Sequence, residues 1–141
     1  MGDSVQDALD VGFERVISIE VEERFYDHCV QRFKPLHYWN KINLFLGSTE
    51  DNIEKLIQEH VDERTMFWLD AHDTGSPYKT EIEAILKHKR NDHVIIIDDI
   101  EKYKIDTNWI KNTLASHNPL YTFTLTNIHP DTGGQFIAYI P

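Results

Sequence analysis

The chain alternates short β-type segments with amphipathic helical segments, and this alternation constrains the fold more than any other feature. Strand-like runs cover residues 15–20, 42–46, 65–69 and 93–97, with helical periodicity between them. That order is typical of βαβ units with right-handed crossovers, which build a parallel sheet. Because residues 94–97 are apolar at every position, we expect them to form a central strand buried on both faces.

The pattern changes toward the C-terminus. Asp106 is suited to cap a helix, and residues 120–128 and 135–140 have the composition of two further strands. The stretch between these strands is rich in turn-forming residues, which favours an antiparallel pair. The predicted fold class is therefore α/β, doubly wound, with a mostly parallel Rossmann-like sheet and a C-terminal antiparallel hairpin.

Size and composition narrow the class of protein. The chain has 141 residues, of which 40% are hydrophobic and 27% charged. This length suits a single domain over residues 1–141, and this balance excludes disordered, collagen-like and membrane-spanning classes. The apolar run at residues 94–97 is far shorter than the ~20 residues that a membrane span needs.

Charge and cysteine content indicate the partners and the compartment. The formal net charge is −10 and the basic residues form no stripe, which argues against binding to a nucleic-acid backbone. The polar N-terminus predicts no signal peptide. Cys29 is the single cysteine; it excludes an internal disulfide and suits packing in a cytoplasmic protein. We expect a cytoplasmic protein that acts on a small molecule, with neither nucleic acid nor membrane as partner.

Acidic residues follow the expected strands at the ends where an open parallel sheet binds ligands. Glu20 ends the first strand, Asp70 follows the third, and Asp98 and Asp99 follow the fourth. Neighbouring strands lie about 4.8 Å apart, so the last three carboxylates would repel one another unless a proton or a cation lay among them. Oxygen ligands select a hard divalent ion such as Mg²⁺. The alternative is that each aspartate serves a turn or a cap.

Two further residues at these strand ends have more than one interpretation. Glu20 can accept hydrogen bonds from the ribose hydroxyls of a nucleoside cofactor, or it can interact with the dipole of the helix that follows. His72 comes two residues after Asp70 and is a candidate general base, because an unperturbed histidine titrates near pH ~6.5.

Several of these segments together resemble one enzyme family. They are residues 13–20 (Phe-Glu-Arg-Val-Ile-Ser-Ile-Glu), Gly47-Ser48, residues 67–72 (Phe-Trp-Leu-Asp-Ala-His) and residues 93–99 (His-Val-Ile-Ile-Ile-Asp-Asp). The combination is similar to class I S-adenosylmethionine-dependent methyltransferases, in the branch around macrocin O-methyltransferase. The match runs from Gly2 to about Tyr103.

The resemblance implies a role for each candidate position. Glu20 would hold the ribose of S-adenosylmethionine, and Gly47, Ser48 and Thr49 would line the adenine pocket. Asp70, Asp98 and Asp99 would bind a divalent cation such as Mg²⁺, which orients a sugar or catechol-like diol and lowers the pKa of the attacking hydroxyl. The catalytic candidates are His72, as base, and Asp70. The implied reaction is O-methyl transfer to a small-molecule or sugar hydroxyl.

The sequence departs from the family at its start. Such methyltransferases begin with a strand and a glycine-rich turn, whereas this chain opens on residues that resemble the start of the first helix. We therefore expect an N-terminally incomplete domain whose unpaired strand edges favour a homo-oligomer. The alternative function is a non-catalytic remnant that binds partners or oligomerises. Mg²⁺-dependent phosphate chemistry ranks last, because no Gly-Lys-Ser/Thr sequence is present.

Overall fold

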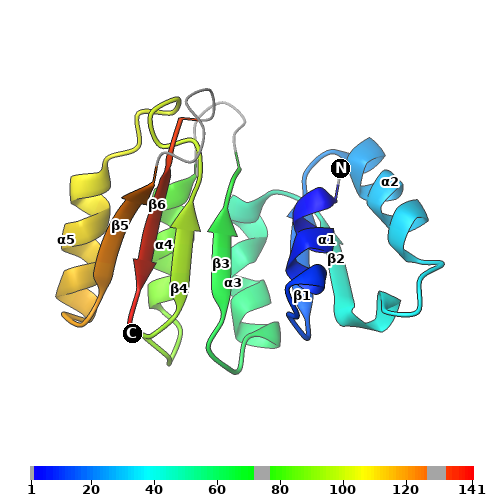
Figure 1. Cartoon of the computed structure of the whole chain (residues 1–141), viewed down its shortest axis with the longest axis horizontal. Helices are drawn as coiled ribbons and strands as arrows, with labels where there is room; N and C mark the ends of the chain where they lie inside the picture. The colour runs from blue at the N-terminus through cyan, green and yellow to red at the C-terminus, as the bar shows by residue number, and fades with distance from the viewer. Residues whose placement is uncertain (1, 72–76, 127–132) are drawn as a thin grey trace. The chain divides into compact units, whose positions relative to one another are not determined.

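The computed structural model describes residues 2–71, 77–126 and 133–141 (Figure 1). The chain divides into two compact units, residues 1–52 and residues 53–141. The single domain expected from the sequence stays a prediction. In the part of the chain that the structure describes, no helix is long and apolar enough to cross a membrane.

The first unit is a parallel strand pair with two helices. Strands β1 and β2 pair in register from Val16 opposite Ile42 to Glu20 opposite Leu46. The helix α3 begins in this unit and continues into the second. The elements are α1 (Asp3–Asp10), β1 (Val16–Glu20), α2 (Glu23–Phe33), a 3₁₀ turn (Trp39–Lys41), β2 (Ile42–Leu46) and α3 (Thr49–His60).

The core of the first unit lies between its helices and one face of the strand pair. Val5 from α1, Cys29 and Phe33 from α2, and Ile42 from β2 form one buried cluster. Cys29 is buried, as predicted, and burial is the main cause that raises the pKa of its thiol. The spacing of Cys29 and Phe33 at i and i+4 puts both side chains on the same face of the helix.

The second unit is a mixed four-stranded sheet in the order β3-β4-β6-β5. Strands β3 and β4 are parallel, whereas β6 runs antiparallel to both β4 and β5. The α/β class with a parallel part and a C-terminal antiparallel hairpin is thus confirmed. The elements are β3 (Met66–Leu69), α4 (Tyr78–Leu86), β4 (Val94–Ile97), α5 (Thr107–His117), β5 (Thr122–Thr126) and β6 (Gln135–Tyr139).

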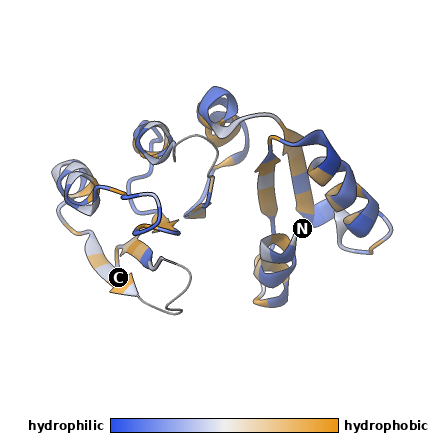
Figure 2. Ribbon diagram, turned by 90° about the horizontal axis from the view of Figure 1, so that it is seen from above, coloured by the Kyte–Doolittle hydropathy of each residue, from blue (hydrophilic) through white to orange (hydrophobic). Residues whose placement is uncertain are grey.

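The core of the second unit lies on one face of its sheet. Ile95 and Ile97 of β4, with Phe136 and Ala138 of β6, are fully buried in a cluster to which α3, α4 and α5 all contribute. Figure 2 shows these helices along one side of the strands. Alternate residues such as Ile96 point to the other face and are only half-buried. The expectation that residues 94–97 are buried on both faces was therefore wrong, although β4 does lie inside the sheet.

Candidate functional site

In the first unit, the carboxyl ends of β1 and β2 bring Glu20 beside Gly47. Glu20 pairs with Leu46 in the register, and the amide of Gly47 donates a hydrogen bond of 2.9 Å to the main-chain carbonyl of Glu20. Oε1 of Glu20 accepts a bond of 3.0 Å from the amide of Glu22, where α2 begins. The carboxylate therefore contacts the start of α2 and is held at the strand-end edge.

The turn from β2 into α3 fixes Gly47, Ser48 and Thr49. Gly47 has φ +147°, and a Cβ there would lie 2.7 Å from Nδ2 of Asn52. Oγ of Ser48 accepts from the amide of Asp51 at 3.3 Å and donates to its carboxylate at 2.8 Å. Ser48 is thus the N-cap of α3, and Thr49 is the first helical residue. Their part in an adenine pocket stays a prediction.

In the second unit, the register of β3 and β4 places Asp70 beside Asp98. Leu69 is opposite Ile97, and the amide of Asp98 donates to the carbonyl of Leu69 at 3.1 Å. Each aspartate is the next residue along its strand, so the two main chains leave the sheet at the same edge. Asp70 is exposed and Asp98 is half-buried.

The loop after β4 holds Asp99 in a left-handed conformation with φ +53°. Its amide donates to Oδ1 of Asp98 at 3.0 Å. The turn is fixed from the other side, because the amide of Glu101 donates to the carbonyl of Gly133 at 2.9 Å. Gly133 allows this close approach: a Cβ there would lie 3.4 Å from the Cα of Asp99. The position of Asp99 is therefore set by backbone contacts with the start of β6.

Lys102 is the residue at this edge that sequence reasoning missed. Its Nζ lies 3.0 Å from Oδ2 of Asp99, and it also lies over the ring of Tyr103, 4.9 Å from the ring centre. The hydrogen bond to Asp99 is the main cause that raises the pKa of Lys102. The signal was present in the sequence, because a lysine three residues after an aspartate can reach back to it within one turn of chain.

The candidate residues do not form one described cluster. Glu20, Gly47, Ser48 and Thr49 belong to the first unit, and the three aspartates belong to the second. Among the residues that the structure describes, no three acidic, histidine or cysteine side chains are gathered as a metal site requires. His72 lies outside the described residues. The aspartates have the oxygen donors that a hard cation prefers, and Asp99 already contacts a positive charge.

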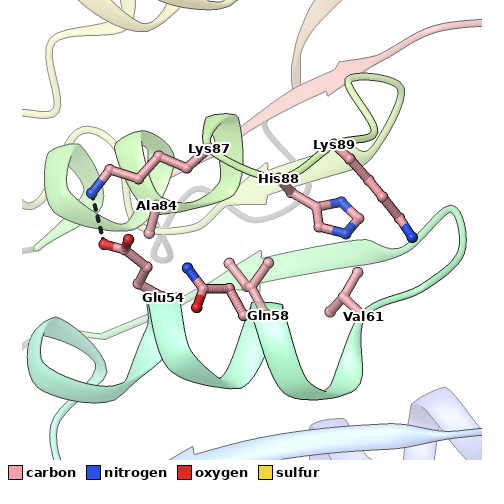
Figure 3. A pocket seen from close by; sticks show the side chains of 8 residues that line it. Glu54, Gln58, Val61, Ala84, Lys87, His88 and Lys89 are labelled. Atoms are coloured by element: carbon pink, nitrogen blue, oxygen red, sulfur yellow. Dashed lines mark hydrogen bonds and ion pairs between the residues drawn. The ribbon is translucent and has the colours of Figure 1, made fainter.

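A separate groove of about 220 Å³ lies between α3 and α4 (Figure 3). An ion pair joins the two sides of the groove: Nζ of Lys87, the residue after α4, lies 2.6 Å from Oε2 of Glu54 in α3. His88 also lines the groove and contacts His93, the residue before β4. The groove therefore lies toward the amino ends of β3 and β4, away from the edge that carries the aspartates.

Solved structures of methyltransferases are similar to this chain. An O-methyltransferase from Bacillus cereus in complex with SAH (S-adenosylhomocysteine) has a TM-score of 0.65 and 18% identity, covering 90% of this chain and 63% of that chain. The SAH-bound methyltransferase PaMTH1 from Podospora anserina has 0.62 and 13%, covering 90% and 61%. The O-methyltransferase TomG from Streptomyces achromogenes, in complex with SAM, has 0.56 and 16%, covering 89% and 61%.

At these identities the likeness shows the fold, which is that of S-adenosylmethionine-dependent O-methyltransferases. No family model and no curated protein matches the sequence. The chain spans 61 to 63% of the length of these solved structures. The resemblance inferred from the sequence is therefore confirmed for the fold.

Proposed function

We propose that the protein binds S-adenosylmethionine and transfers its methyl group to a hydroxyl of a small molecule or sugar, as in the macrocin branch of the family. The observation that carries this proposal is the placement of Glu20 and Gly47 together at the carboxyl ends of β1 and β2. Solved proteins of the same fold hold SAH or SAM. The cofactor would supply an electrophilic methyl group on sulfur. The proposal places the protein in the cytoplasm, with no nucleic-acid or membrane partner.

The first unit would hold the nucleoside. The carboxylate of Glu20 would accept hydrogen bonds from the two ribose hydroxyls, with its orientation set by the amide of Glu22. Gly47 has no side chain, so a flat base could approach the main chain there. Ser48 and Thr49 would border the base through the first turn of α3.

The second unit would hold the divalent cation and the acceptor. Asp70, Asp98 and Asp99 supply oxygen ligands suited to Mg²⁺, and they are the residues that would hold it. A bound divalent ion lowers the pKa of a coordinated hydroxyl and stabilises the resulting alkoxide. In this proposal His72 takes the proton from the acceptor hydroxyl, and Asp70 is a catalytic residue as well as a ligand.

Calorimetric titration with SAH, with and without Mg²⁺, tests the proposal. Glu20→Gln should weaken SAH binding at least about tenfold, because a buried ribose contact to a charged acceptor is worth about 1.5–3 kcal/mol. Glu22→Gln is the matched control, since that side chain is exposed and pairs loosely with Arg24 at 3.7 Å. Absence of heat and of a thermal shift up to millimolar SAH would contradict the catalytic function.

A second candidate function, self-association, is favoured by the terminal position of β3 in the sheet of the second unit. This strand ends the four-stranded sheet. The carbonyls of Thr65 and Leu69 accept hydrogen bonds from β4, so Met66 and Trp68 direct their backbone groups to the outer edge. Trp68 is 44% exposed. An unpaired strand edge is a template for a further strand.

Antiparallel pairing of two copies about Phe67 would place Arg64 opposite Asp70 of the second copy. Arg64 would give up its present bond to the carbonyl of Ile140. Sedimentation velocity should then find a dimer that Trp68→Lys converts to a monomer. Leu125→Lys is the control, because Leu125 is 53% exposed on β5, at the other end of the sheet. A monomeric wild type that binds SAH would remove this candidate.

A further inference from the structure

The groove between α3 and α4 combines an apolar part with hydrogen-bond donors, and the proposed methyl transfer uses none of its residues. It lies wholly within the second unit and has a volume of about 220 Å³. A water molecule takes up about 30 Å³ of liquid, so the groove has room for about seven waters or one small organic molecule. The apolar part consists of Ile57, Val61 and Ala84, each no more than 8% exposed.

A chain of hydrogen bonds determines which nitrogen of His88 carries the proton. The ring of His93 is fully buried, which favours its neutral form, and its Nδ1 accepts from the amide of Thr65 at 3.2 Å. The proton of His93 therefore lies on Nε2, which donates to Nδ1 of His88 at 2.9 Å. The amide of Arg90 donates to the same atom at 3.4 Å. Nδ1 of His88 is thus an acceptor, and the proton of the neutral His88 ring lies on Nε2.

Nε2 of His88 is directed into the groove. Figure 3 shows the ring extending from the α4 side toward α3, with Val61 opposite. Nδ1 takes both of the hydrogen bonds of this ring, and no protein group in the described part of the chain accepts from Nε2. The hydrogen-bond chain that begins at the main chain therefore ends in an N–H that offers itself to an acceptor atom in the groove.

Two lysines add positive charge to the groove, although the chain is acidic overall. Lys87 is neutralised by its ion pair with Glu54. Lys89 has no acidic partner among the residues that the structure describes. Figure 3 shows its side chain reaching toward Val61, on the same side of the groove as the His88 ring. A ligand atom that accepts from His88 would therefore also lie near an unpaired ammonium group.

The backbone at the end of α4 does not cancel this charge. The last carbonyls of a helix normally carry a partial negative charge, which disfavours anions. Here the carbonyls of Ala84 and Ile85 accept hydrogen bonds from the amides of Lys87 and His88 at 3.3 and 3.1 Å. The side chains of His88 and Lys89 therefore decide which charge the groove prefers.

We propose that this groove binds a small organic anion, a carboxylate with a short apolar body, at a site separate from the proposed cofactor site. A carboxylate oxygen would accept from Nε2 of His88 beside the ammonium group of Lys89. The apolar body would lie on Ile57, Val61 and Ala84, where it leaves water. The site needs residues of the second unit only, so the proposal does not depend on the proposed function.

Titration of the ¹⁵N-labelled protein with benzoate at constant ionic strength, followed by nuclear magnetic resonance, tests the proposal. At slightly alkaline pH the imidazole spectrum should show His88 protonated on Nε2, and its signals should shift saturably with benzoate. Benzamide has the same shape without the charge, so it should bind at least about threefold more weakly. Inorganic phosphate has the charge without the apolar body and should also bind more weakly than benzoate.

Lys89→Met should weaken benzoate binding about three- to fivefold, because an ion pair that is exposed to solvent contributes up to about this factor. Lys55→Met is the matched control. Lys55 is an exposed lysine of α3 that does not line the groove, so its loss should change the affinity less than about twofold at the same ionic strength.

Four results would overturn the proposal. A proton on Nδ1 of His88 would remove the donor from the groove, and shifts that do not saturate would remove the site. Equal losses in Lys89→Met and Lys55→Met would reduce the effect to the general charge of the surface. Equal affinity for benzoate and phosphate would mean an adventitious ion only. The predicted order of ligands and variants would support the site whether or not the protein binds SAH.

Discussion

Nε2 of His93 lies 2.9 Å from Nδ1 of His88, so a fully buried imidazole is hydrogen-bonded to one that lines the groove beside α3. The amide of Thr65 donates to Nδ1 of His93 at 3.2 Å. Nδ1 of His93 is therefore an acceptor, and its proton lies on Nε2, which donates to His88. This arrangement needs a neutral His93. Burial is the main cause that lowers its pKa from 6.5 to about 4.

The first prediction is acid lability of the second unit. His93 titrates near 6.5 when unfolded and near 4 when folded, so the unfolded chain takes up the proton first as the pH falls. The stability that His93 contributes is complete above pH 6.5 and is lost on acidification toward pH 4, by at most about 3 kcal/mol. Urea unfolding of Trp39→Phe, whose remaining tryptophans Trp68 and Trp109 both lie in the second unit, measures this across the pH range.

The control for this prediction is His93→Phe in the same background. Phenylalanine fills the buried space without a titrating nitrogen, so the free energy of unfolding should depend less steeply on pH between 6.5 and 4. The comparison is between slopes, because the variant also loses the bonds to Thr65 and His88. Equal slopes in the two proteins would show that His93 does not carry the acid response.

The second prediction concerns the opposite end of the pH scale. The hydroxyl of Tyr121 donates to the carbonyl of His93 at 3.1 Å, and burial is the main cause that raises its pKa from 10.0 to about 12. The unfolded chain therefore loses this proton first, and stability should fall as the pH rises from 10 toward 12. Tyr121→Phe should cost about 1–2 kcal/mol at neutral pH and flatten the alkaline slope. An unchanged slope in the variant would contradict this assignment.

The third prediction is that the N-cap of α5 stabilises the second unit. The carboxylate of Asp106 accepts bonds from the amides of Asn108 and Trp109 at 3.1 and 3.0 Å. Asp106→Ala should lower the free energy of unfolding by about 1 kcal/mol, whereas Asp106→Asn should keep most of it, since asparagine is an equally good cap. Urea denaturation in the Trp39→Phe background, followed by the fluorescence of Trp68 and Trp109, measures both. Equal losses in the two variants would mean that the cap is not what Asp106 contributes.

Local sequence signals predicted the elements and the strand ends well. Asp106 marked the start of α5, because a capping residue acts on the backbone next to it. The pairing of Asp70 with Asp98 followed from two strands of similar length ending in an acid. For the helix cap the physical cause lies within a few residues of the observation, whereas Asp70 and Asp98 are brought together by the pairing of β3 with β4.

Other features that depend on distant contacts were not predicted. The apolar run of β4 is typical of a strand buried on both faces, yet Ile96 is only half-buried. The reason is that α3, α4 and α5 all pack on one face of the sheet in the second unit. The His88–His93 bond joins two residues whose spacing fits no metal motif. Lys102 was passed over, because its importance depends on the left-handed turn at Asp99, which Gly133 supports from the start of another strand.

The last prediction separates two effects of adding a side chain at Gly47: strain in the backbone and a collision with Asn52. Its φ of +147° disfavours any side chain, and a Cβ would also meet Nδ2 of Asn52 at 2.7 Å. That nitrogen donates to the carbonyl of Ser48 at 2.8 Å, so Gly47→Ala must move Asn52 and weaken the first turn of α3. We expect a loss of about 1–2 kcal/mol in stability and a weaker calorimetric response to SAH.

Gly12→Ala is the control for Gly47→Ala, because Gly12 also has a positive φ, +99°, while a Cβ there would meet nothing within 4 Å. Gly12→Ala imposes the strain of a positive φ in the same unit without the collision. It should therefore lower the free energy of unfolding less than Gly47→Ala does, and its affinity for SAH should match that of the wild type. If both variants lose SAH binding equally, the effect is a general loosening of the first unit. If only Gly47→Ala loses it, the strand-end turn itself contacts the ligand or positions the groups that do.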